Sequence, residues 1–264
     1  MTDYLHFAEQ TAREAGALLR EGYTRAKRID FKGSVDLVTE YDHRSEQLIL
    51  GRIRAAFPQH AIRAEESGRS GQAADYEWLV DPVDGTTNFA HGFPIFAVSI
   101  ALARRGTPVA GAVYDPTRDE MFLAEAGQGA ALNGARLQVT AETRLDRALL
   151  TTGFPYDVRT SADNNFAQFM QFYKRAQAVR RPGSAALDGA YVACGRVDGY
   201  WEFKMKPWDL AAAALLVREA GGRVTTAEGD EDFLGKPSVV MSNGHLHDQM
   251  LRVLREGDAA PLPE

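Results

Sequence analysis

The sequence predicts a layered fold of the α+β or α/β class. Strand-like segments and amphipathic helices alternate along the whole chain, and neither a repeat nor a low-complexity linker separates them. The first part of the chain is rich in hairpin signals, and the second part mixes helices with strands. For a chain of 264 residues we therefore expect one unit, residues 1–264, whose two halves, roughly 1–145 and 146–264, pack closely together.

Two helices are expected to open the first half. Apolar residues recur at helical spacing over residues 3–27 and again over residues 43–57, where Pro58 ends the second helix. Asn133-Gly134 lies between apolar residues and predicts a hairpin turn. Short strand-like segments precede it at residues 61–66, 76–81, 96–104, 108–116 and 120–127.

The second half is expected to interleave helices and strands. A helix over residues 207–222 ends in Gly221-Gly222, which is typical of a C-terminal cap. The other predicted helices cover residues 164–177, 183–199 and 244–255. Strands are predicted at residues 199–203 and 239–241.

Charge and cysteine content limit the class of protein. The net charge is −6, from 36 acidic and 30 basic residues, which is not the basic surface of a typical nucleic-acid-binding domain. Cys194 is the single cysteine, so the chain forms no intramolecular disulfide, in agreement with a reducing compartment. The sequence lacks both a secretion signal and an apolar run of the ~20 residues that span a bilayer. We expect a cytoplasmic protein without a membrane segment.

The stretch WLVDPVDGTTNFAHGFP, residues 78–94, places polar residues where a strand ends. Asp81 and Asp84 surround a proline, and this pattern is compatible with a simple turn or with a binding site. The residues that follow resemble a helix start capped by Thr or Asp, and free N–H groups at residues 85–88 would form an anion site. Two like unit charges ~4 Å apart repel by about 4 kcal/mol at an effective dielectric of about 20. A divalent cation such as Mg²⁺, Mn²⁺ or Ca²⁺ would turn the repulsion between carboxylates and phosphate into attraction.

Further carboxylates are available for such a site. They occur where strands end and helices begin, at Glu65, Glu66, Asp209, Asp36 and Asp42. Each also has a plain structural interpretation. The glutamates can form a solvated strand end, and the aspartates can cap helices, Asp42 that of residues 43–57. From the residues alone both interpretations stay open.

Taken together, these segments resemble the inositol monophosphatase family. The resemblance is carried by DLVTEYD, EES, WLVDPVDGTTNFAHGFP and PWDLAAAALLVREAGG, in the order and approximate spacing of the family. RRPGSAALDGAYVACGRVDGYWE is most similar to the bacterial inositol-1-monophosphatase, or extragenic suppressor, branch. The resemblance implies a layered αβαβα sandwich of the sugar-phosphatase type. It also implies a homodimeric, lithium-sensitive, Mg²⁺-dependent enzyme that releases phosphate from myo-inositol monophosphate by means of metal-activated water.

The same resemblance implies a set of metal ligands. Two Mg²⁺ ions, and a third, weaker one, would be bound by the carboxylates of Glu65, Asp81, Asp84 and Asp209 and by the backbone carbonyl of Val83. Lys32 would lie near the position of the third ion.

Catalytic and substrate-binding roles are implied in the same way. Glu65 would hold the ion that activates water, and Thr86 with Asp42 would orient that water. The phosphate would be bound by the backbone N–H groups of Gly85 and Thr86. The inositol group would contact Glu202, Gly183, Ser184 and Ala185.

Two alternatives to this function stay open. The same chemistry could act on fructose 1,6-bisphosphate, histidinol phosphate or a nucleotide 3′-phosphate, and a second phosphate would need a basic pocket. Four residues could supply it: Arg180, Arg181, Lys204 and Lys206. The other alternative is a binding role associated with RNA or transcription, alongside turnover or instead of it.

Overall fold

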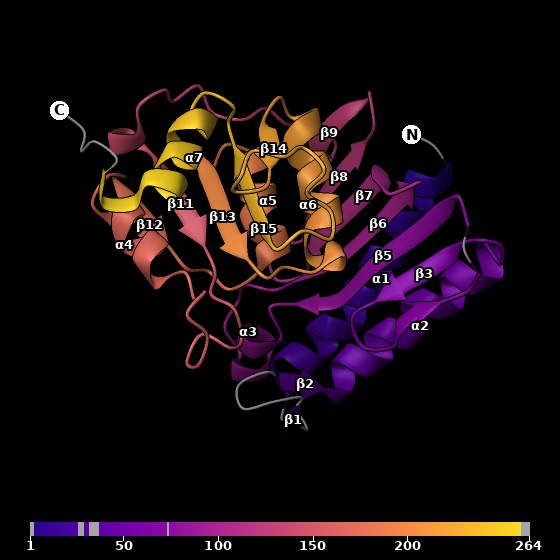
Figure 1. Ribbon diagram of the computed structural model, residues 1–264. Helices are drawn as coiled ribbons and strands as arrows, with labels where there is room; N and C mark the ends of the chain where they lie inside the picture. Colours follow the sequence, from indigo (N-terminus) through magenta and orange to yellow (C-terminus); the bar gives the residue numbers. More distant parts are fainter. Residues whose placement is uncertain (1–2, 26–28, 32–36, 73, 260–264) are drawn as a thin grey trace.

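Two β-sheets and three layers of helices make up the fold (Figure 1). The computed structural model describes residues 3–25, 29–31, 37–72 and 74–259. Helices cover the outer face of each sheet, and two more helices lie between the sheets. This arrangement confirms the predicted layered αβαβα class. None of the described helices combines the length and the apolar character that crossing a membrane requires.

The larger sheet has eight strands in the order β10-β9-β8-β7-β6-β5-β3-β4. β3 and β5 are parallel, and the other neighbouring strands are antiparallel. The strands are β3 (Ala61–Ala64), β4 (Gly68–Ser70), β5 (Tyr76–Asp84), β6 (Ala97–Arg104), β7 (Thr107–Asp115), β8 (Glu120–Glu125), β9 (Gly129–Leu132) and β10 (Ala135–Arg136). β1 (Ile29–Phe31) and β2 (Leu37–Thr39) form a separate antiparallel pair.

Alternating side chains on β6 divide the larger sheet into two faces. Val98, Ile100 and Leu102 pack against α1 (Asp3–Tyr23) and α2 (Glu40–Ala56). Ala101 and its small neighbours point the other way, toward the inner helices. A strand alternates its side chains with a period of two, so each face of the sheet contributes to a different core. The small residues on the inner face let a helix approach the strands closely.

The smaller sheet has the order β12-β11-β13-β15-β14 and separates the inner helices from the second outer pair. Its strands are β11 (Leu149–Thr152), β12 (Ala178–Arg180), β13 (Gly199–Phe203), β14 (Arg223–Thr225) and β15 (Ser238–Ser242). The inner helices are α5 (Ala185–Ala193) and α6 (Pro207–Glu219), and the outer ones are α4 (Phe166–Tyr173) and α7 (His247–Glu256). The short helix α3 (Thr86–His91) and two 3₁₀ helices, η1 (Leu145–Arg147) and η2 (Gly257–Ala259), complete the described elements.

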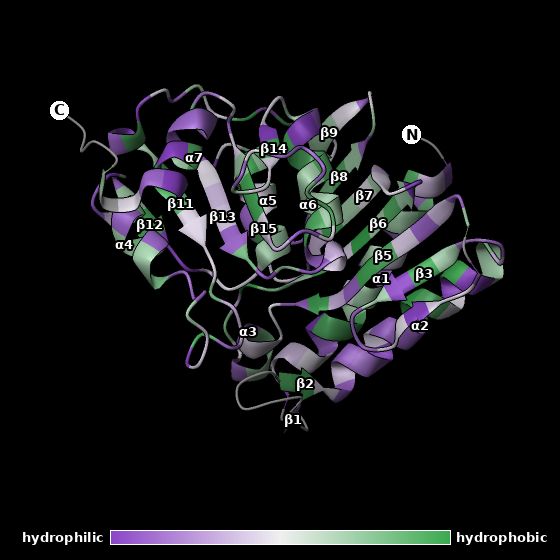
Figure 2. Ribbon diagram, in the orientation of Figure 1, coloured by the Kyte–Doolittle hydropathy of each residue, from purple (hydrophilic) through white to green (hydrophobic). Residues whose placement is uncertain are grey.

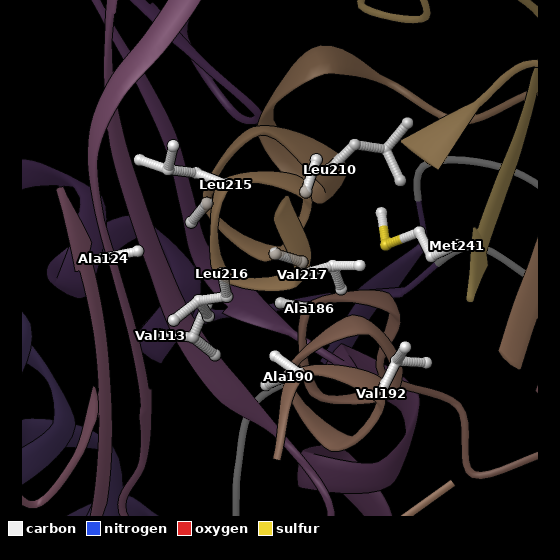
Figure 3. Packing of buried hydrophobic residues seen from close by; sticks show 14 of the residues in the cluster. Val113, Ala124, Ala186, Ala190, Val192, Leu210, Leu215, Leu216, Val217 and Met241 are labelled. Carbon is white, nitrogen blue, oxygen red and sulfur yellow. The ribbon is translucent and has the colours of Figure 1, made fainter. Parts of the chain in front are cut away.

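The two inner helices are packed unusually closely (Figure 3). A Cβ added to Gly189 of α5 would lie 2.7 Å from Cβ of Ala213 on α6 and 2.9 Å from Sδ of Met241. On the other side of α6, a Cβ on Gly111 would lie 3.0 Å from Cα of Ala212. Figure 2 shows that α5 and α6 are mostly hydrophobic, whereas hydrophilic residues alternate on the outer helices α2 and α7. Small residues therefore bring both helix N-termini close to the larger sheet.

Several predicted boundaries were wrong. α2 begins at Glu40 rather than 43, because the preceding Thr39 and the first turn form a capping box. The first helix ends at Tyr23, and the last begins at His247. The helix predicted over 164–177 covers only Phe166–Tyr173. The short strands β1, β2, β4, β11, β12 and β14 were not predicted, because three or four residues carry too little periodicity to be recognised.

Candidate active site

The carboxyl end of β5 carries Asp81 and Asp84, and both side chains are buried. Asp81 pairs with Ser99 of β6, but Asp84 pairs with Ala97, so the register shifts between them. Such an irregularity bends a strand and re-aims its side chains. Gly85 then adopts a left-handed φ of 91° and leads into α3 (Thr86–His91). The helix expected after Asp84 is present, but its N-cap is Gly85 without a side-chain cap, not Thr or Asp.

The first turn of α2 holds this strand end. The Thr86 hydroxyl lies 3.0 Å from Oδ1 of Asp42 and 2.9 Å from the carbonyl oxygen of Val83. Oδ2 of Asp42 accepts hydrogen bonds from the backbone N–H and the hydroxyl of Thr39, at 2.8 and 2.6 Å. Ser45 also donates to the carbonyl of Pro82, at 3.0 Å. Asp42 therefore lies at position N3 of α2, not in front of the helix, and it links the helix cap to Thr86.

Backbone N–H groups at the N-termini of α5 and α6 donate hydrogen bonds to Asp84 and Asp209. Asp84 accepts hydrogen bonds from the Ser184 hydroxyl and from the backbone N–H groups of Ala185 and Ala186, at 3.1 and 2.9 Å. Asp209 accepts one from the backbone N–H of Lys206 at 2.8 Å. The positive end of a helix dipole stabilises a carboxylate. The Ser184 hydroxyl, expected at the inositol group, is bonded to Asp84 in the structure.

These elements surround a cavity of about 450 Å³. Its walls include most of the predicted site residues: Glu65, Asp81, Val83, Asp84, Gly85, Thr86, Gly183, Ser184, Ala185, Glu202 and Asp209. Asp42 is fully buried behind Thr86 rather than on the wall. Lys32 lies outside the described residues. Arg181, Lys204 and Lys206 line the cavity as well, but Arg180 is exposed on β12 and is not on its wall.

The cavity concentrates negative charge away from water. The pKa of Asp81 is raised well above its ordinary value by burial and by the charges of Glu65, Asp84 and Asp209. Burial also raises the pKa of Asp209, although its hydrogen bond from Lys206 opposes the shift. Burial raises the pKa of Asp84 to about 6, in spite of the hydrogen bonds from Ser184 and the helix N-terminus. A group of buried, mutually repelling carboxylates is energetically unfavourable unless protons or cations neutralise it.

The donor set fits a hard divalent cation. All the candidate ligands are carboxylate or carbonyl oxygens, which Mg²⁺ prefers. Within residues 3–25, 29–31, 37–72 and 74–259, however, no three His, Cys, Asp or Glu side chains are already arranged as a metal-binding group. Asp84 and Asp209 instead direct their oxygens to backbone N–H groups of α5 and α6. Each carboxylate has about four lone-pair sites, so these hydrogen bonds leave acceptor capacity for an ion.

Sequence reasoning missed a second acidic group behind Glu202. Tyr200 donates a hydrogen bond to Oε2 of Glu202 at 2.7 Å, and burial raises the pKa of Glu202 to about 7. Asp188 is buried on α5, and its pKa is raised well above the ordinary value by burial and by the charge of Glu202. The available signal was a single acidic residue in the small-residue helix AALDGAYVA. Burying an ionised aspartate is unfavourable unless a hydrogen bond or an opposite charge compensates it, so an Asp in a buried helix indicates a polar neighbour.

Comparison with known proteins places this site in a defined class. Residues 1–259 match the inositol monophosphatase family, and the chain belongs to that family. It is therefore a phosphatase. A protein named Nus factor SuhB from Pseudomonas aeruginosa is 44% identical over 262 residues, which are 97% of each chain. An inositol-1-monophosphatase from Synechocystis sp. is 43% identical over 253 residues, which are 95% of this chain and 88% of that one.

Solved structures agree with this assignment. The inositol monophosphatase from Anabaena (Nostoc) sp. has a TM-score of 0.89 and 44% identity, covering 96% of both chains. The extragenic suppressor protein suhB from Bartonella henselae has a TM-score of 0.90 and 38% identity, covering 97% of this chain and 100% of that one. The family resemblance inferred from the sequence motifs is thus confirmed.

The raised pKa values predict a pH-dependent stability for the metal-free protein. A carboxyl group whose pKa is higher in the folded state stabilises the fold below its unfolded pKa and loses that contribution as pH rises through the folded pKa. For Glu202 that window runs from the unfolded value up to about 7. We expect the free energy of unfolding to fall mainly between about pH 4.5 and pH 7, by roughly 3 kcal/mol from Glu202 alone.

Urea unfolding in the presence of a chelator measures this dependence. Glu202→Gln removes one of the titrating groups, so its curve should be flatter than that of the wild type. Added Mg²⁺ should restore more stability at pH 8 than at pH 5, because protons compete with the metal for the carboxylates. Equal slopes for wild type and Glu202→Gln would contradict the assignment of this titration to Glu202.

Proposed function

We propose that this protein is a Mg²⁺-dependent phosphomonoester hydrolase that releases phosphate from myo-inositol monophosphate. The observation that carries the proposal is a buried carboxylate cluster beside the hydrogen-bonded pair Thr86 and Asp42. The relative from Synechocystis named inositol-1-monophosphatase supports the choice of substrate. Hydrolysis of a phosphate monoester depends on positioning and charge neutralisation more than on covalent chemistry. This site offers both.

The metal ligands we propose are Glu65, Asp81, Asp84, Asp209 and the carbonyl of Val83. They would hold two Mg²⁺ ions, and a third, weaker ion would lie near Glu65 and Lys32. When bound, Mg²⁺ lowers the pKa of a coordinated water and stabilises the charge that develops on the leaving oxygen. The Val83 carbonyl oxygen lies 2.9 Å from the Thr86 hydroxyl, but a carbonyl oxygen has two lone pairs and can contact both the hydroxyl and an ion.

Thr86 and Asp42 would orient the attacking water. The single hydroxyl proton of Thr86 is directed to Asp42 or to the Val83 carbonyl, both within 3.0 Å. The lone pairs of the Thr86 oxygen can therefore accept a hydrogen bond from a water in the cavity. Thr39 fixes Asp42 from the other side. The backbone N–H groups of Gly85 and Thr86 would bind the phosphate.

The polyol would lie toward Glu202, Gly183 and Ala185. A carboxylate accepts hydrogen bonds from hydroxyl groups, and a protonated Glu202 can also donate one. Tyr200 holds the Glu202 carboxyl in place. Fructose 1,6-bisphosphate, histidinol phosphate and nucleotide 3′-phosphates remain alternative substrates for the same chemistry.

Asp84→Asn tests the metal assignment. We expect turnover of myo-inositol 1-phosphate to fall about a thousandfold or more, because several kcal/mol of transition-state stabilisation would be lost. The variant should stay folded, since an amide oxygen can still accept hydrogen bonds from Ser184 and the N-terminus of α5. Phosphate release with and without Mg²⁺, together with thermal melting, measures both effects. Full activity of the variant at saturating Mg²⁺ would show that Asp84 is not an essential ligand.

Thr86→Val and Thr86→Ser test the pair with Asp42. Valine keeps the shape of threonine but loses the hydroxyl, so kcat should fall by about 10²- to 10⁴-fold. Serine keeps the hydroxyl and should retain most of the activity. The same assay on both variants gives the result. If the two substitutions lower kcat equally, the hydroxyl is not the group that matters.

A second candidate function is a binding role associated with RNA or transcription. The observation that favours it is the set of relatives that carry the name Nus factor SuhB. Against its being the only function, this chain has every carboxylate that the metal site requires. An RNA complex that weakens with salt and survives in the inactive Asp84→Asn variant would support a second role.

We also propose that the protein is a homodimer through the exposed face of α4. Phe166, Met170 and Tyr173 are exposed and lie at i, i+4 and i+7 of this helix. A contiguous apolar patch of this kind favours association. Analytical ultracentrifugation should give a dimer for the wild type and a folded monomer for Met170→Glu. A monomeric wild type at micromolar concentration would be evidence against the dimer.

A further inference from the structure

Lys204 has a backbone conformation that is unusual for a lysine. It follows the last residue of β13 and has a φ of 60°, in the left-handed region that favours glycine. Its backbone N–H donates to the carbonyl of Pro237 at 2.5 Å. Residues persist in this region where the surrounding contacts hold them, and such positions concentrate at functional sites. Lys204 lies two residues after Glu202, and both line the active-site cavity.

The side chain of Lys204 is bound to the loop that follows β11, the strand next to β13. Its Nζ donates to Oδ1 and Oδ2 of Asp157, at 3.0 and 2.8 Å, and to the Ser161 hydroxyl at 2.6 Å. The ammonium group is thus engaged by both oxygens of the Asp157 carboxylate and by one hydroxyl. We call this set of contacts, among Lys204, Asp157 and Ser161, the latch.

The loop held by the latch covers residues 153–165 and is fixed at its base. The buried Asn165 donates to the Thr152 hydroxyl at 2.9 Å and to the Gly153 carbonyl at 2.6 Å, and accepts from Trp201 at 2.8 Å. Gly153 lies directly against Glu202, since a Cβ there would lie 2.1 Å from both carboxylate oxygens. The loop base thus packs on the proposed polyol contact, and residues 153–157 line the cavity.

Three basic residues line the cavity and could contact a second phosphate: Arg181, Lys204 and Lys206. Arg181 lies near two acidic groups, because its charge lowers the pKa of both Asp188 and Glu202. The backbone of Lys206 lies beside Asp209, at the metal-binding end of the cavity. Lys204 also lines this wall, two residues after Glu202, and its ammonium group already contacts the loop.

We propose that the latch is a specificity determinant that restricts the cavity to phosphate monoesters carrying one phosphate. It engages the Lys204 ammonium and keeps it from a second phosphate group, and it holds the cavity-lining loop 153–165 against β13. This inference rests on the proposed phosphatase function. It distinguishes inositol monophosphate from bisphosphate substrates by a contact outside the metal site.

Asp157→Asn tests the effect on specificity. The Lys204 and Asp157 side chains are 30% and 52% exposed, so the ion pair is screened and its loss should change kcat/KM by no more than about fivefold. We expect the ratio of kcat/KM for fructose 1,6-bisphosphate to that for myo-inositol 1-phosphate to rise about three- to fivefold at low salt. The rise should disappear at high salt and in the double variant Asp157→Asn, Lys204→Gly, which lacks the freed cation. An unchanged ratio at low salt would overturn the proposal.

Asp75→Asn is a matched control. Asp75 is 55% exposed and forms an ion pair with Arg105 at 2.9 Å, just before the opposite end of β5 from the cavity. This variant makes the same substitution in a similar exposed pair, so it should leave the substrate ratio unchanged. A rise equal to that of Asp157→Asn would show that net charge, rather than the latch, sets the ratio.

Limited trypsin digestion tests the latch without any activity. Arg159 is an exposed cleavage site inside the loop. Lys204→Gly removes the cation but keeps the backbone favourable, because glycine tolerates the left-handed conformation. Cleavage after Arg159, identified by mass, should be faster in Lys204→Gly than in the wild type. Equal rates would overturn the latch, whereas a wild type inactive on both esters would overturn the proposed function and leave this digestion result valid.

Discussion

Repulsion among buried carboxylates is the constraint around which this molecule is organised. Asp81, Asp84 and Asp209 come from two different elements, and burial together with their mutual charges raises their pKa values. The fold compensates with helix N-termini: the backbone N–H groups that begin α5 and α6 point at Asp84 and Asp209. The unfavourable charge is therefore maintained by the packing of whole helices, and the geometry of the inner layer follows from it.

Close packing of small residues makes that geometry possible. Gly189 and Ala213 bring α5 and α6 together, and Gly111 lets α6 approach the larger sheet. A larger side chain at Gly189 would push α5 away from α6, and one at Gly111 would push α6 and its Asp209 away from the larger sheet. The composition of the inner helices, rich in alanine and glycine, is thus as much a part of the active site as the acidic residues. The positions of the acidic residues and the packing of the small core residues therefore depend on the same distances between helices and sheet.

Local sequence patterns were sufficient for the layers, and the family resemblance supplied most of the cavity wall, but neither predicted contacts between distant segments. Helical and alternating periodicity predicted α1, α6 and the central strands, and the motif around Asp81 predicted the site. The start of α2 was predicted three residues too late. The Asp42 carboxylate accepts a hydrogen bond from the Thr39 backbone N–H and lies beside the Thr86 hydroxyl, a contact between distant segments. Contacts such as Lys204 with Asp157, 47 residues apart, depend on how the chain folds back and leave no mark in local periodicity.

Asp42 connects the start of α2 to the proposed catalytic hydroxyl of Thr86. One carboxylate oxygen belongs to the capping box of α2 and the other receives the Thr86 hydroxyl, so the first helical turn and the reactive end of the cavity open together. Fraying of that single turn would release Thr86 while both sheets stay intact. The alignment of the proposed catalytic pair therefore depends on the hydrogen bonds of one buried helical turn, in addition to the strands that carry the carboxylates.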